Sequence, residues 1–430
     1  MAQTLKFGNG TWATKEGSTL AYNDENENYK PLPFNFERDS IATRVNKEGL
    51  IEVVGNDIPR IDYTDSADGV LLLEEGSSNR VPWSEDINNS AWAKIAVTVD
   101  ANQIISPDGT QNADLITETT ANSQHRISDI VTLSTGVEHT ISAWVKPNGT
   151  KYVRLRIENA AVGSGQVDVY FDMENLLPSL SNGSIKKYSN GWYRLSATGT
   201  PNNAASVAIV GLAPDLGLSS YVGDGVSGAY VWGVQVEQSS YATSYIPTSG
   251  STVPRAAETA NGSGNSEVFN DSEGVLFADI AANSKGGGYK LISLTDSTSG
   301  NSFISIGMMN NTTQSYKQIR FSGVNLFPDF TDDINQTSFN KIAIKYKSGD
   351  SSFYINGFEI DSSSVTYTPN AAMSELKFSY FQDGDDFYGK TKEIAYYDTV
   401  LTDLELETLT SYRTWESMVK ELNLNVIYNG

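Results

Sequence analysis

Hydrophobic and polar residues alternate with a period of two along most of the middle and C-terminal parts of the chain. The alternation is clearest in TISAWV (140–145), KYVRLRI (151–157), YVWGVQVE (230–237) and KIAIKY (341–346). Successive side chains of a β-strand point to opposite faces of the sheet, so each segment predicts a strand with one buried face. Sheets that bury one face and expose the other to solvent are typically antiparallel.

Short turns separate these predicted strands. Asn-Gly pairs occur at 148–149, 182–183, 190–191 and 356–357, and this pair supplies the positive φ angles that a tight hairpin needs. Many short strands joined by such turns indicate β-sandwiches or jelly rolls. We therefore predict a mainly β fold: two antiparallel β-sandwich (jelly-roll) domains after an irregular N-terminal region, with a short C-terminal helix.

Changes in composition indicate where the domains begin and end. Residues 1–82 are rich in Asn and Glu and only weakly periodic, so we expect an irregular N-terminal region there. A first β-sandwich is expected over 83–250, and a second one, with the C-terminal helix, over 268–430. The stretch between them, 251–267, is small, polar and rich in Gly, as linkers are.

The charge balance excludes several classes of partner. The 430 residues include 30 Lys and Arg against 52 Asp and Glu, a formal net charge of −22. A nucleic-acid backbone or an anionic membrane surface would repel such a chain, so neither is expected as a partner. With no Cys and only His125 and His139, disulfides, thiolate nucleophiles and multi-His metal sites are not expected. We find no secretory signal and no apolar run of about 20 residues, and therefore expect no membrane insertion.

Three stretches resemble known families. ERDSIATRVNKEGLIEVVGNDIPRIDY (37–63), followed by GVLLLEEGSSNRVPWSEDINNSAWAK (69–94), is similar to a cassette common in virion proteins of tailed bacteriophages. EHTISAWVKPNGTKYVRLRI (138–157) and AYVWGVQVEQSSYATSYIPTSG (229–250) resemble a carbohydrate-binding-module-like jelly roll. FNKIAIKYKSGDSSFYINGFEI (339–360) resembles part of a concanavalin A-like, laminin G-type domain.

The resemblance implies a structural protein of a phage virion, a head fibre or a tail fibre, made in the host cytoplasm and displayed on the particle. The N-terminal region would attach to other virion proteins of the capsid or tail. The two sandwiches would bind glycans of the host surface or of the environment, and homotrimers are common among such fibres. On this interpretation the protein is not an enzyme. Two alternatives stay open: a polysaccharide depolymerase of the phage tail, and a purely structural capsid decoration or adaptor protein.

Aromatic side chains are the first candidates for glycan contact, because the C–H groups of a sugar ring stack on a flat aromatic face. Trp144 lies on the strand face opposite the apolar residues of its segment, where it could stack on sugar or pack against another sheet or subunit. Trp232 shares its predicted face with apolar residues and is expected in the core. Tyr380 and Tyr388 border an acidic loop and are further candidates for glycan binding.

Two groups of acidic residues are candidates for chemistry. Asp383, Asp385 and Asp386 lie on a predicted loop, where carboxylate oxygens suit Ca²⁺. Their spacing is not that of an EF-hand, and a solvated acidic turn is the simpler interpretation. Calcium is the one cofactor that we consider. Glu359 and Asp361 alternate along a strand as the catalytic carboxylates of concanavalin-like glucanases do, but the third carboxylate of that pattern is absent, and we expect no catalysis there.

The tail of the chain, residues 401–424, has the one clear helical pattern, with acidic residues near its start. Apolar residues recur there at spacings near three and four and form a stripe that must be buried. The stripe consists of Leu404, Tyr412, Trp415, Val419 and Leu422. Burial against the chain's own sandwich and burial against sister chains both stay open; the second would make the stripe the interface of a homotrimer.

Overall fold

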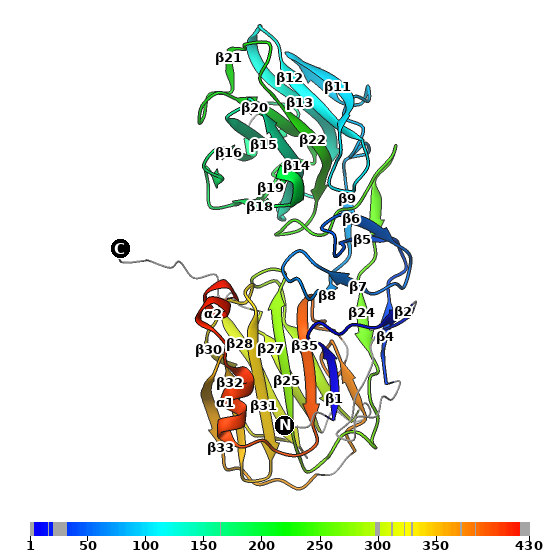
Figure 1. The fold of residues 1–430 in the computed structure, drawn as a ribbon, viewed down its shortest axis with the longest axis vertical. Coiled ribbons are helices and arrows are strands. Elements are labelled where there is room, and N and C mark those ends of the chain that lie inside the picture. Colours follow the sequence, from blue (N-terminus) through cyan, green and yellow to red (C-terminus); the bar gives the residue numbers. More distant parts are fainter. Residues whose placement is uncertain are drawn as a thin grey trace, which may run out of the picture. The chain divides into compact units, whose positions relative to one another are not determined.

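The computed structural model describes residues 4–15, 17–19, 32–163, 165–296, 302–310, 313–321, 323–327, 330–369, 372–382 and 384–421. The chain folds into two compact units, each assembled from segments that are distant in sequence. The first unit combines residues 1–39, 55–75 and 257–430, and the second combines 40–54 and 76–256. Both units consist mainly of antiparallel strands (Figure 1), which confirms the predicted fold class.

Two large antiparallel sheets form most of the first unit. The larger has the order β33–β32–β31–β25–β35–β8–β7, with β1 paired to β35. Its strands are β33 (Phe358–Ser363), β32 (Ser351–Ile355), β31 (Asn340–Lys347), β25 (Glu273–Ala282), β35 (Gly389–Tyr397), β8 (Val70–Leu73), β7 (Arg60–Asp62) and β1 (Leu5–Gly8). The smaller has the order β29–β28–β27–β26–β34, with β30 paired to β28. Its strands are β29 (Val324–Asn325), β28 (Gln314–Phe321), β27 (Phe303–Met308), β26 (Lys290–Thr295), β34 (Glu375–Lys377) and β30 (Phe330–Asp333).

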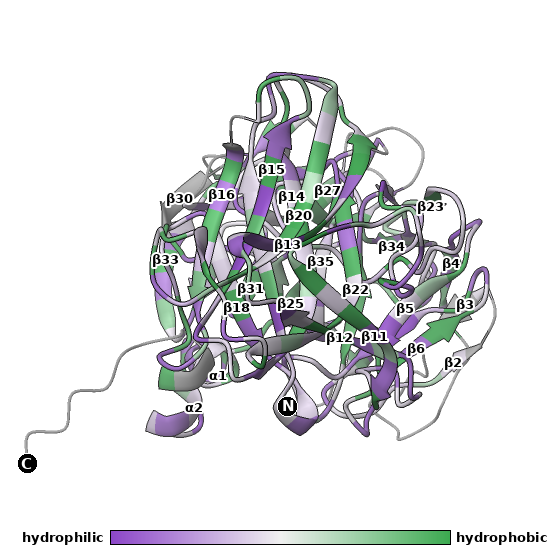
Figure 2. Ribbon diagram, turned by 90° about the horizontal axis from the view of Figure 1, so that it is seen from above, coloured by the Kyte–Doolittle hydropathy of each residue, from purple (hydrophilic) through white to green (hydrophobic). Residues whose placement is uncertain are grey.

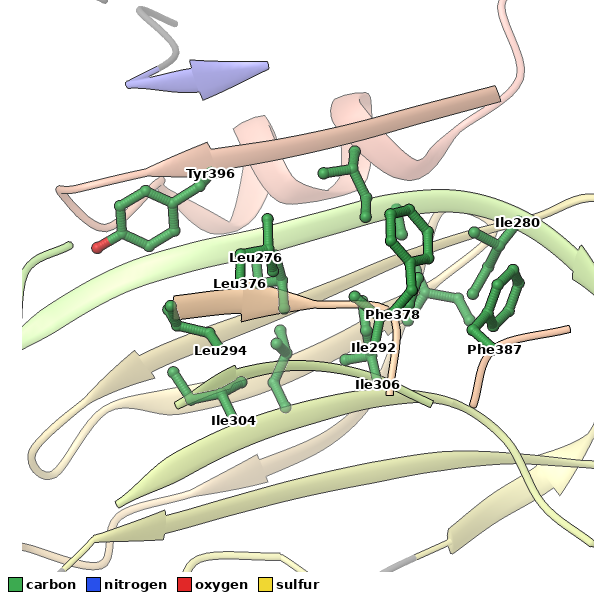
Figure 3. Packing of buried hydrophobic residues seen from close by; sticks show 14 of the residues in the cluster. Leu276, Ile280, Ile292, Leu294, Ile304, Ile306, Leu376, Phe378, Phe387 and Tyr396 are labelled. Carbon is green, nitrogen blue, oxygen red and sulfur yellow. The ribbon is translucent and has the colours of Figure 1, made fainter. Parts of the chain in front are cut away.

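Apolar side chains from the facing sides of these two sheets fill the space between them. Leu276 of β25 meets Ile292 and Leu294 of β26 and Leu376 of β34 in this core, as Figure 3 shows. Each of these four side chains is fully buried. The core therefore depends on alternate residues of strands from both sheets, and the remaining residues of the same strands lie on the outer faces.

The described strands of the expected N-terminal region do not form a separate region: most belong to this sandwich, and residues 40–54 and 76–82 belong to the second unit. β1 pairs with β35, β8 extends the larger sheet, and a small sheet joins β2 (Thr14–Lys15), β3 (Ser18–Thr19), β4 (Phe34–Glu37) and β24 (Thr259–Asn261). The buried residues that these N-terminal strands add to the core are Leu5, Phe7, Phe34, Phe36, Ile61, Leu71 and Leu73. The expected boundary at residue 82 is thus corrected. Strands of two to four residues are too short to show an alternating pattern, which is why the sequence indicated irregular structure.

Two antiparallel sheets also form the second unit. One has the order β10–β13–β20–β15–β16–β17, with β21 paired to β13, and the other the order β11–β12–β22–β14–β19–β18. The first consists of β10 (Ala93–Ile95), β13 (Asn122–Thr132), β20 (Ala205–Ala213), β15 (Tyr152–Asn159), β16 (Gly165–Asp172), β17 (Leu177–Pro178) and β21 (Ser220–Val222). The second consists of β11 (Val97–Ile104), β12 (Ala113–Glu118), β22 (Gly228–Glu237), β14 (His139–Asn148), β19 (Tyr193–Gly199) and β18 (Gly183–Lys187).

The core of the second unit follows the alternation seen in the sequence. Ile141 and Val145 of β14 face Leu155 of β15 and Val169 of β16 between the sheets, and all four are fully buried. Three smaller elements complete this unit: the hairpin β5 (Ala42–Val45)–β6 (Ile51–Val54), the pair β9 (Ser77–Asn79)–β23 (Val253–Arg255), and the 3₁₀ helix η1 (Ser189–Gly191). The expected linker 251–267 therefore contains two strands, β23 and β24, that pair with strands from the N-terminal part of the chain.

The C-terminal tail forms two helices, α1 (Asp403–Thr410) and α2 (Trp415–Glu421), where one was predicted. Thr402 caps the start of α1 in a capping box with Glu405. The chain becomes extended at Ser411, and the Thr414 hydroxyl then accepts a hydrogen bond from the Ser417 backbone N–H at 3.0 Å, which starts the second helix. Among the described residues, no helix is long and apolar enough to cross a membrane.

The predicted apolar stripe of the tail is corrected in two ways. α1 lies against β31 and β32 (Figure 1) and buries Leu406 beside Val275 and Phe277, whereas Leu404 is 72% exposed. Trp415 of α2 is 62% exposed. The helix is interrupted at Ser411, so Trp415 does not continue the face of α1 that packs on the sheet. Two further members of the stripe, Tyr412 and Val419, are half-buried, and Leu422 lies outside the described residues. A role of these residues in a homotrimer stays a prediction.

Candidate functional site

The Trp144 side chain lies on the outer face of its sheet, as the alternation predicted, but that face is covered. The ring is 1% exposed. Trp232 and Tyr245 contact it edge-on, with ring centroids 5.4 and 5.3 Å from that of Trp144. Val45 and Ile51 of the β5–β6 hairpin belong to the same buried cluster. The hairpin and the rings around Trp144 thus occupy the position that a stacked sugar would need.

Hydrogen bonds hold the β5–β6 hairpin on this face. The Thr43 hydroxyl donates to the Tyr245 carbonyl at 2.6 Å, and the Ile51 N–H donates to the Pro107 carbonyl at 2.9 Å. The Ser189 hydroxyl donates to the carbonyl of Gly49, in the hairpin turn, at 3.2 Å. Residues 42–54 therefore form a fixed cover, and Trp144 is corrected from a candidate glycan contact to a buried packing residue.

Trp232 also differs from its predicted place. Ser142 pairs with Gln235 but Trp144 pairs with Trp232, so β22 carries one residue more than β14 between these pairs. Gly233, at φ 63°, sits in this β-bulge. The extra residue shifts the alternation, which moves Trp232 from the inter-sheet core to the outer face beside Trp144.

A row of five aromatic rings crosses the outer face of the smaller sheet of the first unit. It consists of Tyr289, Tyr316, Tyr380, Phe381 and Phe303, and we call it the aromatic row. Successive ring centroids along it are 5.6, 6.5, 4.3 and 4.0 Å apart, and the last pair is stacked. Two rings, Tyr316 and Phe303, are buried against the sheet, and the other three are half-exposed. The first three pairs are edge-on or tilted, so the row offers a sugar the exposed parts of single rings rather than one flat surface.

Polar groups accompany the aromatic row. The Gln318 side-chain oxygen accepts hydrogen bonds from the hydroxyls of Tyr316 at 2.6 Å and Tyr380 at 3.2 Å, which fixes both phenols. Arg320 pairs across the ladder with Phe303, and its buried Nε has no hydrogen-bond partner among the residues that the structure describes. Both phenols are thereby held in place beside the half-exposed rings, and the buried Arg320 Nε leaves one donor unsatisfied under this face.

The sequence had indicated only part of this site. Tyr380 was a candidate and belongs to the row, but Tyr316, Gln318 and Arg320 were not singled out. Their signal is the alternation in QSYKQIRF (314–321), in which every second residue from Tyr316 is polar or aromatic and faces outward. Phe303 joins the row because β27 pairs with β28, which sequence spacing does not reveal.

Tyr388, the other tyrosine candidate, uses its hydroxyl in a hydrogen bond to the acidic loop. Its hydroxyl donates to Asp386 at 3.1 Å, and burial, followed by the charge of Asp386, raises the pKa of this phenol. Asp385 is exposed at φ 50°, and Asp383 lies outside the described residues. No group of three or more His, Cys, Asp or Glu that could hold a metal occurs among the described residues, and the calcium site stays a prediction.

The structure separates Glu359 and Asp361, the carboxylates that a glucanase-like pattern would bring together. Phe353 pairs with Asp361, but the next residue, Tyr354, pairs with Glu359, so β33 has a bulge between the two carboxylates. Asp361 therefore lies on the side of the inter-sheet core and forms an ion pair with Lys317 at 2.9 Å. Glu359 lies on the other side, near the Tyr354 hydroxyl at 3.5 Å. The two carboxylates cannot flank one glycosidic bond.

Comparisons with known proteins add little. No family model and no curated protein matches the chain. Among solved structures, it is similar to domain 4 of AbnA, a GH43 extracellular arabinanase from Geobacillus stearothermophilus, at 18% identity over 36% of this chain and 73% of that one, with a TM-score of 0.28. It is also similar to domains LG4-5 of the mouse laminin α1 chain, at 7% identity over 64% of this chain and 86% of that one, with a TM-score of 0.25. A third similar structure is Trypanosoma rangeli sialidase, at 11% identity over 93% of this chain and 83% of that one, with a TM-score of 0.27.

These similarities correct one expectation. We expected a protein that is not an enzyme, and two of the three similar structures come from enzymes, an arabinanase and a sialidase. The expectation is therefore withdrawn. The low identities and TM-scores supply no argument for catalysis either, so the function has to be argued from this chain's own surfaces.

Proposed function

We propose that the chain is a glycan-binding structural protein of a tailed-bacteriophage virion, a head fibre or a tail fibre, and that the aromatic row is its glycan site. The observation that carries the glycan part is the set of half-exposed rings on one sheet face, in which Tyr380 lies beside Phe381 and Tyr289 lies beyond the buried Tyr316. Several rings in a line suit a chain of sugar units, because each unit can stack on one ring.

The virion part rests on the cassette in residues 37–63 and 69–94, which resembles that of phage virion proteins. In this proposal the protein is made in the host cytoplasm and attaches to the capsid or tail through its N-terminal part. A homotrimer would multiply weak contacts of each aromatic row with a glycan-covered surface. Truncation of the N-terminal part is a poor test of attachment, because the core of the first unit includes its strands β1, β4, β7 and β8.

The glycan site can be tested with one pair of matched variants. Phe381→Ala removes a half-exposed ring of the aromatic row, and we expect it to weaken glycan binding about tenfold or more, which corresponds to about 1.4 kcal/mol. Phe358→Ala removes a ring that is 71% exposed and lies on the larger sheet of the same unit, so binding should not change. A glycan array followed by calorimetry on the strongest ligand measures both.

Two results would contradict this site: equal binding by the two variants, or no bound glycan on a broad array. Release of reducing sugar is measured on the same ligands, because cleavage would assign the protein to the depolymerases. For the virion part, labelled antibody on purified particles should mark the capsid or the tail. Light scattering of the full chain should give three times the mass of 46.7 kDa, and a monomer would contradict the trimer.

A further inference from the structure

The outer face of one sheet in the second unit carries an ordered set of charged side chains. Along β15 and β16 the inward residues are apolar and the outward ones polar, an alternation that Figure 2 shows as bands of opposite colour. We define the arginine face as the outward residues Arg126 of β13, Arg154, Arg156 and Glu158 of β15, and Asp168 of β16. Cross-strand pairing brings them together, because β20 alone separates β13 from β15.

Ion pairs hold the members of the arginine face in fixed positions. Arg154 binds Asp168 through two hydrogen bonds of 2.6 Å, from Nε and from one terminal nitrogen. Glu158 bridges Arg126 at 3.0 Å and Arg156 at 3.1 Å. The Tyr170 ring lies 5.0 Å from the Arg154 guanidinium carbon. Side chains held in this way lose little freedom when a ligand binds.

The donors of this face are not all used. The Arg126 Nε is buried and has no hydrogen-bond partner among the described residues, and the buried Arg156 Nε lies 3.9 Å from an Asp168 carboxylate oxygen, beyond hydrogen-bond range. Leaving such a donor unsatisfied is costly, so a ligand oxygen placed there would be favoured. Three guanidinium groups against two carboxylates leave one excess positive charge, in a chain whose formal net charge is −22.

A gap in the side chains lies between two of the arginines. Gly211 of β20 pairs with Arg126 on one side and with Arg154 on the other. A Cβ at Gly211 would lie 3.7 Å from the Cβ of each, and glycine puts no atom there. Gly211 itself is buried, so the missing side chain only lets the stems of Arg126 and Arg154 lie close together over the sheet.

We propose that the arginine face is a second binding site, for a saccharide that carries a carboxylate, such as a uronic acid. The planar fork of a guanidinium matches a carboxylate, which supplies the anionic part of the recognition. Asp168, whose side chain is 36% exposed, can accept hydrogen bonds from sugar hydroxyls. A polyphosphate offers no such donors and would be repelled by both carboxylates of the face, which favours an acidic sugar over a phosphate.

The site is independent of the proposed function of the aromatic row, because it lies in the other unit and needs a different ligand chemistry. The full chain is titrated by calorimetry with trigalacturonate, with its methyl ester and with inorganic triphosphate. We expect binding of trigalacturonate and at least about tenfold weaker binding of the ester, which keeps the sugar rings but not the charge. Phe381→Ala should leave this binding unchanged, so failure of one site is distinguishable from failure of the other.

Matched variants locate the binding. Arg156→Gln should weaken trigalacturonate binding about tenfold or more. Arg156→Lys, which keeps the charge but loses the fork, should weaken it too. Arg44→Gln is the control: it removes the same charge from the same unit, at an arginine paired to Glu52 at 2.6 Å on the β5–β6 hairpin, and should leave binding unchanged.

Three outcomes would overturn the proposal. They are equal affinity for the acid and its methyl ester, equal loss in Arg156→Gln and Arg44→Gln, and binding of triphosphate as tight as that of trigalacturonate. The comparison of acid and ester uses only the wild-type chain, so the proposal stays testable even if an arginine variant does not fold.

Discussion

Replacing Glu258 by Gln removes one of the two negative charges, Glu258 and Glu74, from a buried ion-pair network in the first unit. Glu258 accepts hydrogen bonds from Arg38 at 2.7 Å, from the Arg60 Nε at 2.8 Å and from the Glu74 backbone N–H at 2.9 Å, and it also contacts an Arg60 terminal nitrogen. Arg60 donates to Glu74 as well, at 2.9 Å. The network joins the three chain segments that build this unit.

The expected magnitude follows from the burial. The side chains of Arg38, Arg60 and Glu258 are all 0% exposed. Burial alone would lower the pKa of Arg60, but the charges of Glu258 and Glu74 outweigh it, and the net direction is upward. In Glu258→Gln two buried guanidinium groups lose that carboxylate, and breaking a buried pair costs about 3–5 kcal/mol. The surface pair of Arg44 with Glu52 is the comparison, because Glu52→Gln should cost about 0–1 kcal/mol.

Urea unfolding of the full chain, followed by circular dichroism, measures the free energy of unfolding of both variants, and calorimetry shows which transition moves. We expect Glu258→Gln to lower the transition of the first unit and to leave that of the second unchanged. A loss below about 1 kcal/mol would refute the reasoning, because it would mean that solvent or another group stabilises the arginines.

Three further changes have defined outcomes. Trp144→Ala should lower the free energy of unfolding by about 3–5 kcal/mol, measured in urea, because the ring is buried under the β5–β6 hairpin; near-neutral behaviour would contradict that cover. Leu406→Ala should cost about 2–5 kcal/mol and Leu404→Ala in the same helix almost nothing, and equal melting temperatures would contradict the observed orientation of α1. Hydrogen bonds from Ser227 lower the pKa of Asp224 from 3.8 to about 2, so the stability that Asp224 adds is present at neutral pH and lost as the pH falls through this range. Thermal unfolding should show Asp224→Asn less stable than wild type at pH 7, with a clearly smaller difference at pH 2.

Much of the sandwich architecture could be predicted from residue alternation alone. Where strands pair without interruption, as β14 does with β19 and β15 with β20, alternate residues face the core as expected. The boundaries of the units could not be predicted in this way. Strands β1, β7 and β8 join the larger sheet of the first unit from positions more than 180 residues before β25, and pairing over such a distance leaves no local signal. Their sequences are short and apolar, and their position in the sheet is determined by the strands with which they pair.

The candidate sites show the same division between local and distant information. Arg154 and Arg156 of the arginine face and the outward residues of β28 follow the alternation of their own strands, so they can be read directly from KYVRLRI and QSYKQIRF. The other members of the arginine face, Arg126, Glu158 and Asp168, lie outside these segments. Trp232 and Asp361 lie beside bulges, and one extra residue moves each to the opposite face. Trp144 has the predicted orientation but not the predicted exposure, because residues 42–54, about 90 positions earlier, cover it. A surface that alternation predicts is therefore available for binding only if no distant segment of the chain packs on it. Both the aromatic row and the cluster around Trp144 are rich in aromatic rings. Only the aromatic row has half-exposed rings that a glycan can reach, whereas Trp144 is buried.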